Sequence, residues 1–236
     1  RAGAVARLSA LDRRTGCGLL GHQGGEGARD AEGPADFGEL VDGVRVVLGV
    51  ACPQRHEHQP RERRHHPQLD RSVHLGAELS AILKFWNDHI ELFGNATVSR
   101  NTIEEGKYFV DAENSVDLSG NRISGFPDLL ANIGIAYNHS GFYLRLTGMY
   151  VGEFFSDNYD NKLMSYLSQY PGFVDYSDNL NEPYFVSDVY ISYEYSIINF
   201  MTPWKVYLQV NNIFDNLYSA NAIGKEFFPA AERNWL

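Results

Sequence analysis

From His74 onward, apolar and polar side chains alternate along the chain, which is the pattern of β-strands whose two faces meet different surroundings. In the first such segment, Leu75 and Leu79 lie on one face and Lys84 lies on the other. The alternation predicts six strands, at 75–84, 90–99, 129–137, 142–150, 188–197 and 205–211. The apolar faces of these six segments carry no charged residue. Arg233 and Asn234 are predicted to begin a seventh strand.

The predicted connections alternate between short and long ones. Short turns are expected at 86–89, 138–141 and about 200–203, and long connections at about 101–125, 153–183 and 214–231. Antiparallel strands of about ten residues can cross a bilayer when they are tilted. The sequence therefore predicts an all-β fold, an antiparallel up-and-down meander that forms part of a transmembrane β-barrel.

Aromatic residues gather at both ends of the predicted strands. One band marks the short turns and comprises Phe85, Trp86, Tyr137, Phe142, Tyr195, Phe200 and Trp204. The second band marks the long connections and comprises Tyr150, Phe154, Phe155, Tyr184 and Phe185. Alternation alone is equally typical of a soluble sandwich, but two aromatic bands one strand apart are typical of membrane interfaces and favour the barrel.

The composition changes near residue 72. Residues 1–71 contain no Lys, Tyr, Ile, Asn, Met or Trp, whereas residues 72–236 hold every Lys and all aromatics except Phe37. Gly, Pro and charged residues dominate the first segment, as in chains that are too polar to bury a core. We expect 1–71 to form no recognisable domain and to be disordered, out of frame or fused, with Val44–Cys52 as its one candidate short strand. Residues 72–236 are expected to form the barrel part.

Composition and motifs exclude several functions. The net charge of −10 argues against a nucleic-acid partner, because phosphate contacts need clustered Lys and Arg. The chain shows no catalytic constellation, so we expect no enzyme activity. Histidines at 56, 58, 65 and 66 lack the acid or Cys spacing of a tetrahedral site. We expect neither a bound metal nor a cofactor.

Two motifs near the carboxyl end carry a family resemblance. The first is Asn212-x-Phe214-Asp215-x-x-Tyr218 and the second is Pro229-x-x-x-Arg233. With the strand opening at 74–79, they resemble the close of TonB-dependent outer-membrane receptors over about residues 74–236. The resemblance implies a barrel of about 22 strands with a plug domain, placed in the outer-membrane lipid. It also implies nutrient import driven by TonB, with a ferric siderophore as the first expectation and cobalamin or a glycan as others.

The resemblance and the alternation together indicate two sets of site residues. Polar residues expected to face the barrel lumen are Glu78, Glu91, Arg145, Asp188 and Glu194. Residues of the long loop that are candidates for substrate contact are Phe154, Phe155, Asp157, Tyr159, Tyr166 and Tyr170. Aromatic rings in such loops stack on sugars or siderophores, but they also pack a loop onto itself, and the sequence leaves both roles open.

Six strands and a beginning cannot close a wide barrel. We therefore expect this chain to be a receptor remnant that does not transport by itself, and no TonB-binding segment is apparent in it. Two alternatives stay open at this point. One is another outer-membrane barrel, a porin or adhesin, and the other is a soluble extracellular carbohydrate-binding β-sandwich.

Overall fold

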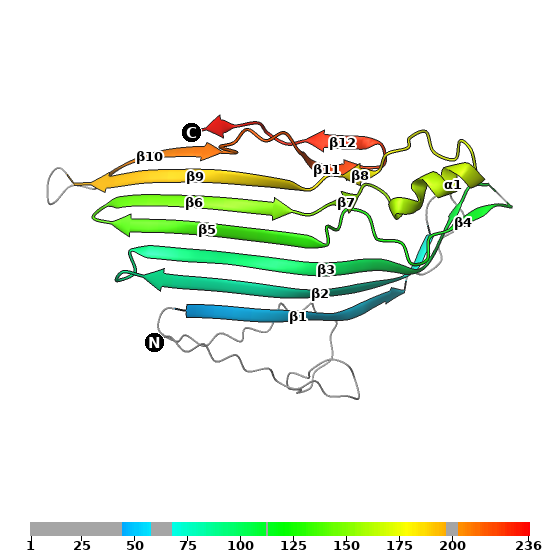
Figure 1. The fold of residues 1–236 in the computed structure, drawn as a ribbon, viewed down its shortest axis with the longest axis horizontal. Helices are drawn as coiled ribbons and strands as arrows, with labels where there is room; N and C mark the ends of the chain where they lie inside the picture. The colour runs from blue at the N-terminus through cyan, green and yellow to red at the C-terminus, as the bar shows by residue number, and fades with distance from the viewer. Residues whose placement is uncertain (1–43, 58–67, 112, 197–202) are drawn as a thin grey trace, which may run out of the picture. The chain divides into compact units, whose positions relative to one another are not determined.

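The computed structural model describes residues 44–57, 68–111, 113–196 and 203–236, all of which lie in the unit Asp36–Leu236. The main sheet is built from long strands (Figure 1). They are β1 (Val44–Glu57), β2 (Gln68–Phe85), β3 (Ile90–Phe109), β5 (Leu129–His139), β6 (Phe142–Val151), β9 (Tyr184–Tyr195), β10 (Trp204–Asn211) and the short β13 (Asn234–Trp235).

The main sheet is an antiparallel meander. Its strands follow the order β1-β2-β3-β5-β6-β9-β10-β13, so that each long strand pairs with the next one along the chain. The six predicted strands are present as β2, β3, β5, β6, β9 and β10, and the predicted seventh begins as β13. The predicted all-β up-and-down fold is therefore confirmed.

Strands β2 and β3 are longer than the alternation predicts. They stay paired from Phe85 and Ile90 at the short turn to Gln68 and Lys107 at the far end. Beyond Val98 the apolar pattern stops, with Arg100 exposed on the same face. The additional residues are paired by backbone hydrogen bonds but show no apolar alternation. A prediction from hydrophobic periodicity therefore ends these strands too early.

Most of the amino-terminal segment lies outside the described residues. Residues 1–43 and 58–67 belong to that part, so the prediction that 1–71 forms no recognisable domain stays a prediction. Within the described part, the backbone of 44–57 forms β1 and pairs with β2.

The register aligns the predicted apolar faces across the sheet. Leu83, Leu92, Ile135, Leu146, Val189 and Val210 form one continuous row from β2 to β10. Many large side chains of this face are exposed, for example Ile133 at 66% and Val206 at 60%. A soluble sandwich would bury such a face against a second sheet. Within the described residues no second sheet covers it, which favours a face that meets lipid.

Short turns join the strands at one end of the sheet and long connections at the other (Figure 1). The turn between β5 and β6 consists of Ser140 and Gly141, both with positive φ, at 50° and 82°. Positive φ at both positions is the type I′ geometry that matches the twist of a hairpin. The predicted turn at about 200–203, with Phe200, lies largely outside the described residues.

The long connections hold further short elements. They are β4 (Ser115–Asp117), β7 (Phe154–Phe155), the 3-10 helix η1 (Asp160–Lys162), α1 (Leu163–Gln169), β8 (Leu180–Asn181), β11 (Ser219–Ile223) and β12 (Glu226–Pro229). The main buried apolar cluster lies where the far part of β3 meets these connections, and its members are Ile103, Val116, Leu118, Tyr159, Leu163 and Tyr166. In the part of the chain that the structure describes, no helix is long and apolar enough to cross a membrane.

Candidate functional site

The polar face of the sheet carries the residues predicted to face the lumen. Arg145 lies between Ala136 of β5 and Tyr190 of β9 in the strand register. Two hollows, of about 310 and 510 Å³, open on this sheet and share Arg145, Thr147 and Asp188 in their linings. These two hollows are open and shallow, and their linings combine polar and apolar side chains.

Arg145 makes its clearest contact with an aromatic ring. Its guanidinium carbon lies 4.9 Å from the centre of the Phe93 ring, which is cation–π distance. The ring reaches across Gly134, where an added Cβ would come within 2.2 Å of Phe93 Cζ. A glycine on the strand between them therefore lets Phe93 and Arg145 meet.

The other predicted lumen residues are spread along the same face. Glu91 forms an ion pair with Lys84 across the β2–β3 hairpin at 3.9 Å. Asp188 Oδ1 accepts a hydrogen bond of 2.8 Å from the backbone N–H of Asn212. Glu194 stands opposite Lys205 in the register, at the short-turn end of β9. The structure does not bring these acids together into one charged site.

The long connections of one end pack into a loop unit, formed by residues 101–128 and 152–182. Arg122 joins its parts, because its guanidinium pairs with three carboxylates from different segments. The distances are 3.2 Å to Asp160, 3.0 Å to Asp128 and 3.5 Å to Glu153. The same group lies 4.5 Å above the centre of the Phe155 ring. Arg122 therefore ties the β3–β5 connection to the β6–β9 connection.

A half-buried carboxylate lies inside the loop unit. Burial raises the pKa of Asp157 above its ordinary value, although three hydrogen bonds favour the charged form. They come from the Asn179 side chain at 2.8 Å, the Tyr159 N–H at 2.7 Å and the Tyr176 hydroxyl at 2.9 Å. Asp157 thus serves as an acceptor that three loop segments share.

The loop residues predicted to contact a substrate are mostly enclosed. Phe154, Phe155, Tyr159 and Tyr166 are at most 8% exposed. Tyr170 is partly buried against the same cluster. Tyr159 and Tyr166 therefore belong to the main buried cluster, whereas Phe154 packs with Val151 and Ala222 in a second one. Contact of the predicted loop residues with a substrate stays a prediction.

Sequence reasoning did not find the residues that the β3–β5 connection contributes. The Asn121 side chain is fully buried and donates to Asn158 O and to the Tyr166 hydroxyl, each at 3.0 Å. Its Oδ1 accepts a hydrogen bond of 2.6 Å from Lys162. No local motif marks Asn121 or Arg122, because all their side-chain partners except Asp128 lie tens of residues away.

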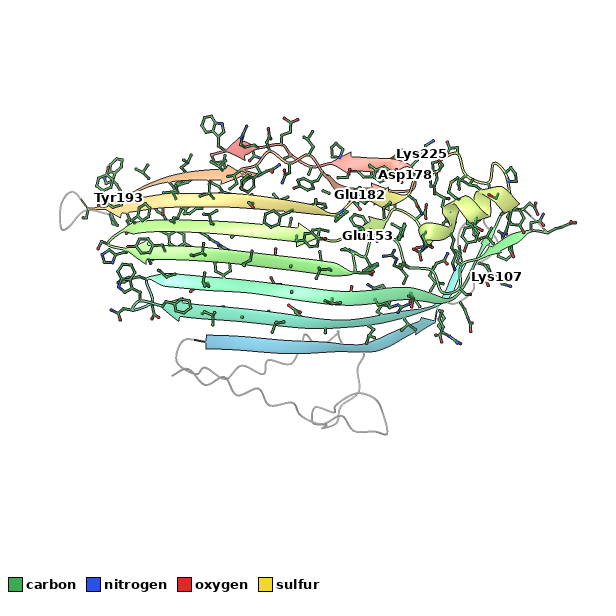
Figure 2. The ribbon with its side chains drawn as sticks, viewed as in Figure 1. Lys107, Glu153, Asp178, Glu182, Tyr193 and Lys225 are labelled. Carbon is green, nitrogen blue, oxygen red and sulfur yellow. The ribbon has the colours of Figure 1, made fainter. Side chains whose placement is uncertain are left out.

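The unit also contacts the hairpin of β11 and β12. Ser156 and Gly224 exchange two hydrogen bonds, and Lys225 pairs with Asp175. Figure 2 shows Glu153, Asp178 and Lys225 at this end of the structure, with Tyr193 at the opposite end. Charged side chains therefore cluster on the long-loop end.

The first carboxyl-terminal motif forms a folded turn after β10. Asn212 is buried and has a positive φ of 52°. Its side chain accepts a hydrogen bond from the N–H of Asn216 at 3.0 Å and donates to Asn216 O at 2.9 Å. Tyr218 stacks on Tyr184 with ring centres 4.3 Å apart. Phe214 is 66% exposed.

The second motif is joined to the first by Asp215. The carboxylate accepts a hydrogen bond of 2.8 Å from the backbone N–H of Arg233 and lies 3.6 Å from its guanidinium. Ala230, the residue after Pro229, donates its N–H to Tyr218 O at 2.9 Å. Both motifs therefore fix the path of the chain into β13, which is a structural role.

Across the described ranges, no group of three or more His, Cys, Asp or Glu side chains is placed to hold a metal ion.

Comparison with protein families gives one match. Residues 61–213 match the family described as TonB dependent receptor-like, β-barrel. A search of curated proteins gave no match.

Solved structures of two receptors and one transporter share the fold. The siderophore receptor PiuA from Acinetobacter baumannii aligns with a TM-score of 0.58 and 15% identity over 83% of this chain and 26% of its own. The ferric citrate transporter FecA aligns with 0.60 and 14%, over 85% and 28%. BauA, the ferric preacinetobactin receptor from Acinetobacter baumannii, aligns with 0.52 and 13%, over 81% and 25%. The chain spans about a quarter of the length of these structures.

Proposed function

The chain belongs to the TonB-dependent receptor-like β-barrel family, and from this premise we propose that it forms part of the barrel of an outer-membrane receptor that imports a scarce nutrient. The family match is the observation that carries the proposal. The exposed apolar face, the polar opposite face and the short turns at one end support it, because a barrel wall needs all three.

We propose a ferric siderophore as the nutrient, with cobalamin or a glycan as the alternatives. PiuA, FecA and BauA are described as a siderophore receptor, a ferric citrate transporter and a ferric preacinetobactin receptor. Their TM-scores of 0.52–0.60 at 13–15% identity support the fold, and the substrate is inferred from the family. Coupling to TonB belongs to the same proposal.

Uptake of radioactive iron by cells tests the proposal. The cells express the receptor that carries this chain as part of its barrel, and they are given ferric complexes of catecholate, hydroxamate and carboxylate siderophores. We expect uptake of at least one complex, and its loss in cells that lack TonB. Equal uptake without TonB would indicate a passive pore, and uptake of cobalamin or a glycan alone would contradict the siderophore assignment.

The substrate is proposed to meet the loop unit at Tyr170, the least enclosed of the candidate aromatic residues. A ring that is partly exposed has a face available for stacking, whereas buried Tyr166 holds the core. Tyr170→Ala is therefore expected to weaken siderophore binding while the loop unit stays resistant to protease. Tyr166→Ala serves as the contrast, because it is expected to loosen the unit itself.

A further inference from the structure

Two imidazole rings lie in contact at the short-turn end of the sheet. His89 is the last residue of the turn at 86–89, and His139 is the last residue of β5. Their ring centres are 4.6 Å apart and their planes are nearly perpendicular, at 88°. The pairing of Ile90 with Tyr137 brings them side by side. Neither ring takes part in the contacts of the loop unit.

The tautomer of His89 follows from its hydrogen bond. Nδ1 lies 2.9 Å from the backbone oxygen of Asn138. A carbonyl oxygen only accepts, so Nδ1 carries the proton in the neutral ring and Nε2 keeps its lone pair. A backbone carbonyl on the far nitrogen is the arrangement that orients metal-ligating histidines in proteins.

The surroundings leave the pair accessible. His139 is exposed and His89 is only partly buried. Trp86 packs edge-on against His89, with ring centres 5.9 Å apart, and Tyr137 lies 6.4 Å from the His139 ring. The aromatic rings hold the two imidazoles from the sides without closing them off from solvent.

We propose that His89 and His139 bind one divalent transition-metal ion, with Nε2 of His89 as one ligand. Two nitrogens at about 2.0–2.1 Å from one ion come within about 3.4 Å of each other. The ring centres are 4.6 Å apart. While His89 keeps its bond to Asn138, the exposed His139 is the ring that has to turn to bring a nitrogen to that shorter separation. Across the described ranges no third His, Cys, Asp or Glu joins the set, so water completes the coordination. Imidazole ligands and the Irving–Williams order favour Cu²⁺ over Zn²⁺ or Ni²⁺.

The proposal is tested by quenching of tryptophan fluorescence in the full chain, folded in detergent micelles. Trp86 is one of three tryptophans, and the substitutions Trp204→Phe and Trp235→Phe leave it as the single reporter beside His89. Titration with Cu²⁺ is expected to quench its emission, and EDTA is expected to restore it. The reporter confines the signal to this site even though the chain has eight histidines.

The variants His89→Gln and His139→Gln separate ligation from other causes of quenching. Each is expected to raise the Cu²⁺ concentration for half quenching by about tenfold or more, since loss of even an outer partner of a metal site typically costs 10–100-fold. The matched control is His74→Gln. The His74 ring is hydrogen-bonded to the Asn101 side chain, and this substitution is expected to leave the titration unchanged. The β-sheet circular dichroism signal verifies that each variant is folded. Absence of quenching in the parent chain overturns the proposal. Quenching of both variants at the same Cu²⁺ concentration as the parent also overturns it.

Discussion

Replacement of Asn212 by Ala tests whether the first motif holds the chain in register at the end of the sheet. The side chain makes hydrogen bonds to both the N–H and the carbonyl of Asn216 and a longer one of 3.4 Å to Ala231 O. The bond from the backbone N–H to Asp188 survives the substitution, because it needs no side chain. What is lost is therefore the clamp between the turn and the segment that leads into β13.

The expected cost follows from two contributions. Two good hydrogen bonds contribute about 1 kcal/mol each. Residue 212 has a left-handed φ of 52°, a conformation that Asn tolerates. Ala in this conformation costs about 1–2 kcal/mol. Asn212→Ala should therefore lower the free energy of local unfolding by about 3–4 kcal/mol. Asn212→Gly should cost about 2 kcal/mol, because Gly adopts positive φ without strain.

Hydrogen exchange at the end of the sheet measures these costs. The amides of Gln209 and Leu236 bond to each other's carbonyl oxygens across β10 and β13, at 3.1 and 2.9 Å. Their exchange should accelerate in Asn212→Ala, and less in Asn212→Gly, while amides of the β6–β9 pair stay protected. Unchanged exchange in Asn212→Ala, or faster exchange in the Gly variant than in the Ala variant, would refute the reasoning.

Three further substitutions test the polar face and the loop unit. Gly134→Ala should destabilise the sheet by about 1–3 kcal/mol in urea unfolding, because the new methyl group meets the Phe93 ring, and adding Phe93→Leu should recover part of the loss. Arg122→Met leaves Asp160 without its guanidinium partner and should weaken the loop unit by about 1–3 kcal/mol, seen as faster protease cleavage within 152–183, with Arg122→Lys intermediate. Burial raises the pKa of Asp157 above 3.8, so the native state binds more protons than the unfolded state between the two pKa values. The loop unit should therefore lose stability as pH rises through that window, and Asp157→Asn should remove the dependence of protease resistance on pH.

The strand pattern was predictable because it is local. A strand between lipid and a polar interior needs unlike neighbours along most of its length, and the segment from Ala77 to Ser80 shows them. The order of short and long connections was predictable for the same reason, because two residues such as Ser140-Gly141 are enough to mark a hairpin turn. The motif at 212–218 was visible from sequence because it resembles a family pattern. Its turn is closed locally by Asn212 and Asn216, whereas its contacts with Asp188 and Tyr184 on distant segments became clear only in the structure.

Only the tertiary structure decided what the long connections do. Ile103 and Tyr166 share one core, and Arg122 meets Asp160, across separations that no local pattern records. The contact of His89 with His139 likewise depends on the register of β3 against β5. Sequence specifies the chemistry of each strand face, because neighbours along the chain determine it. The partners of a loop side chain are selected when distant segments pack, and that choice exists only in the folded protein.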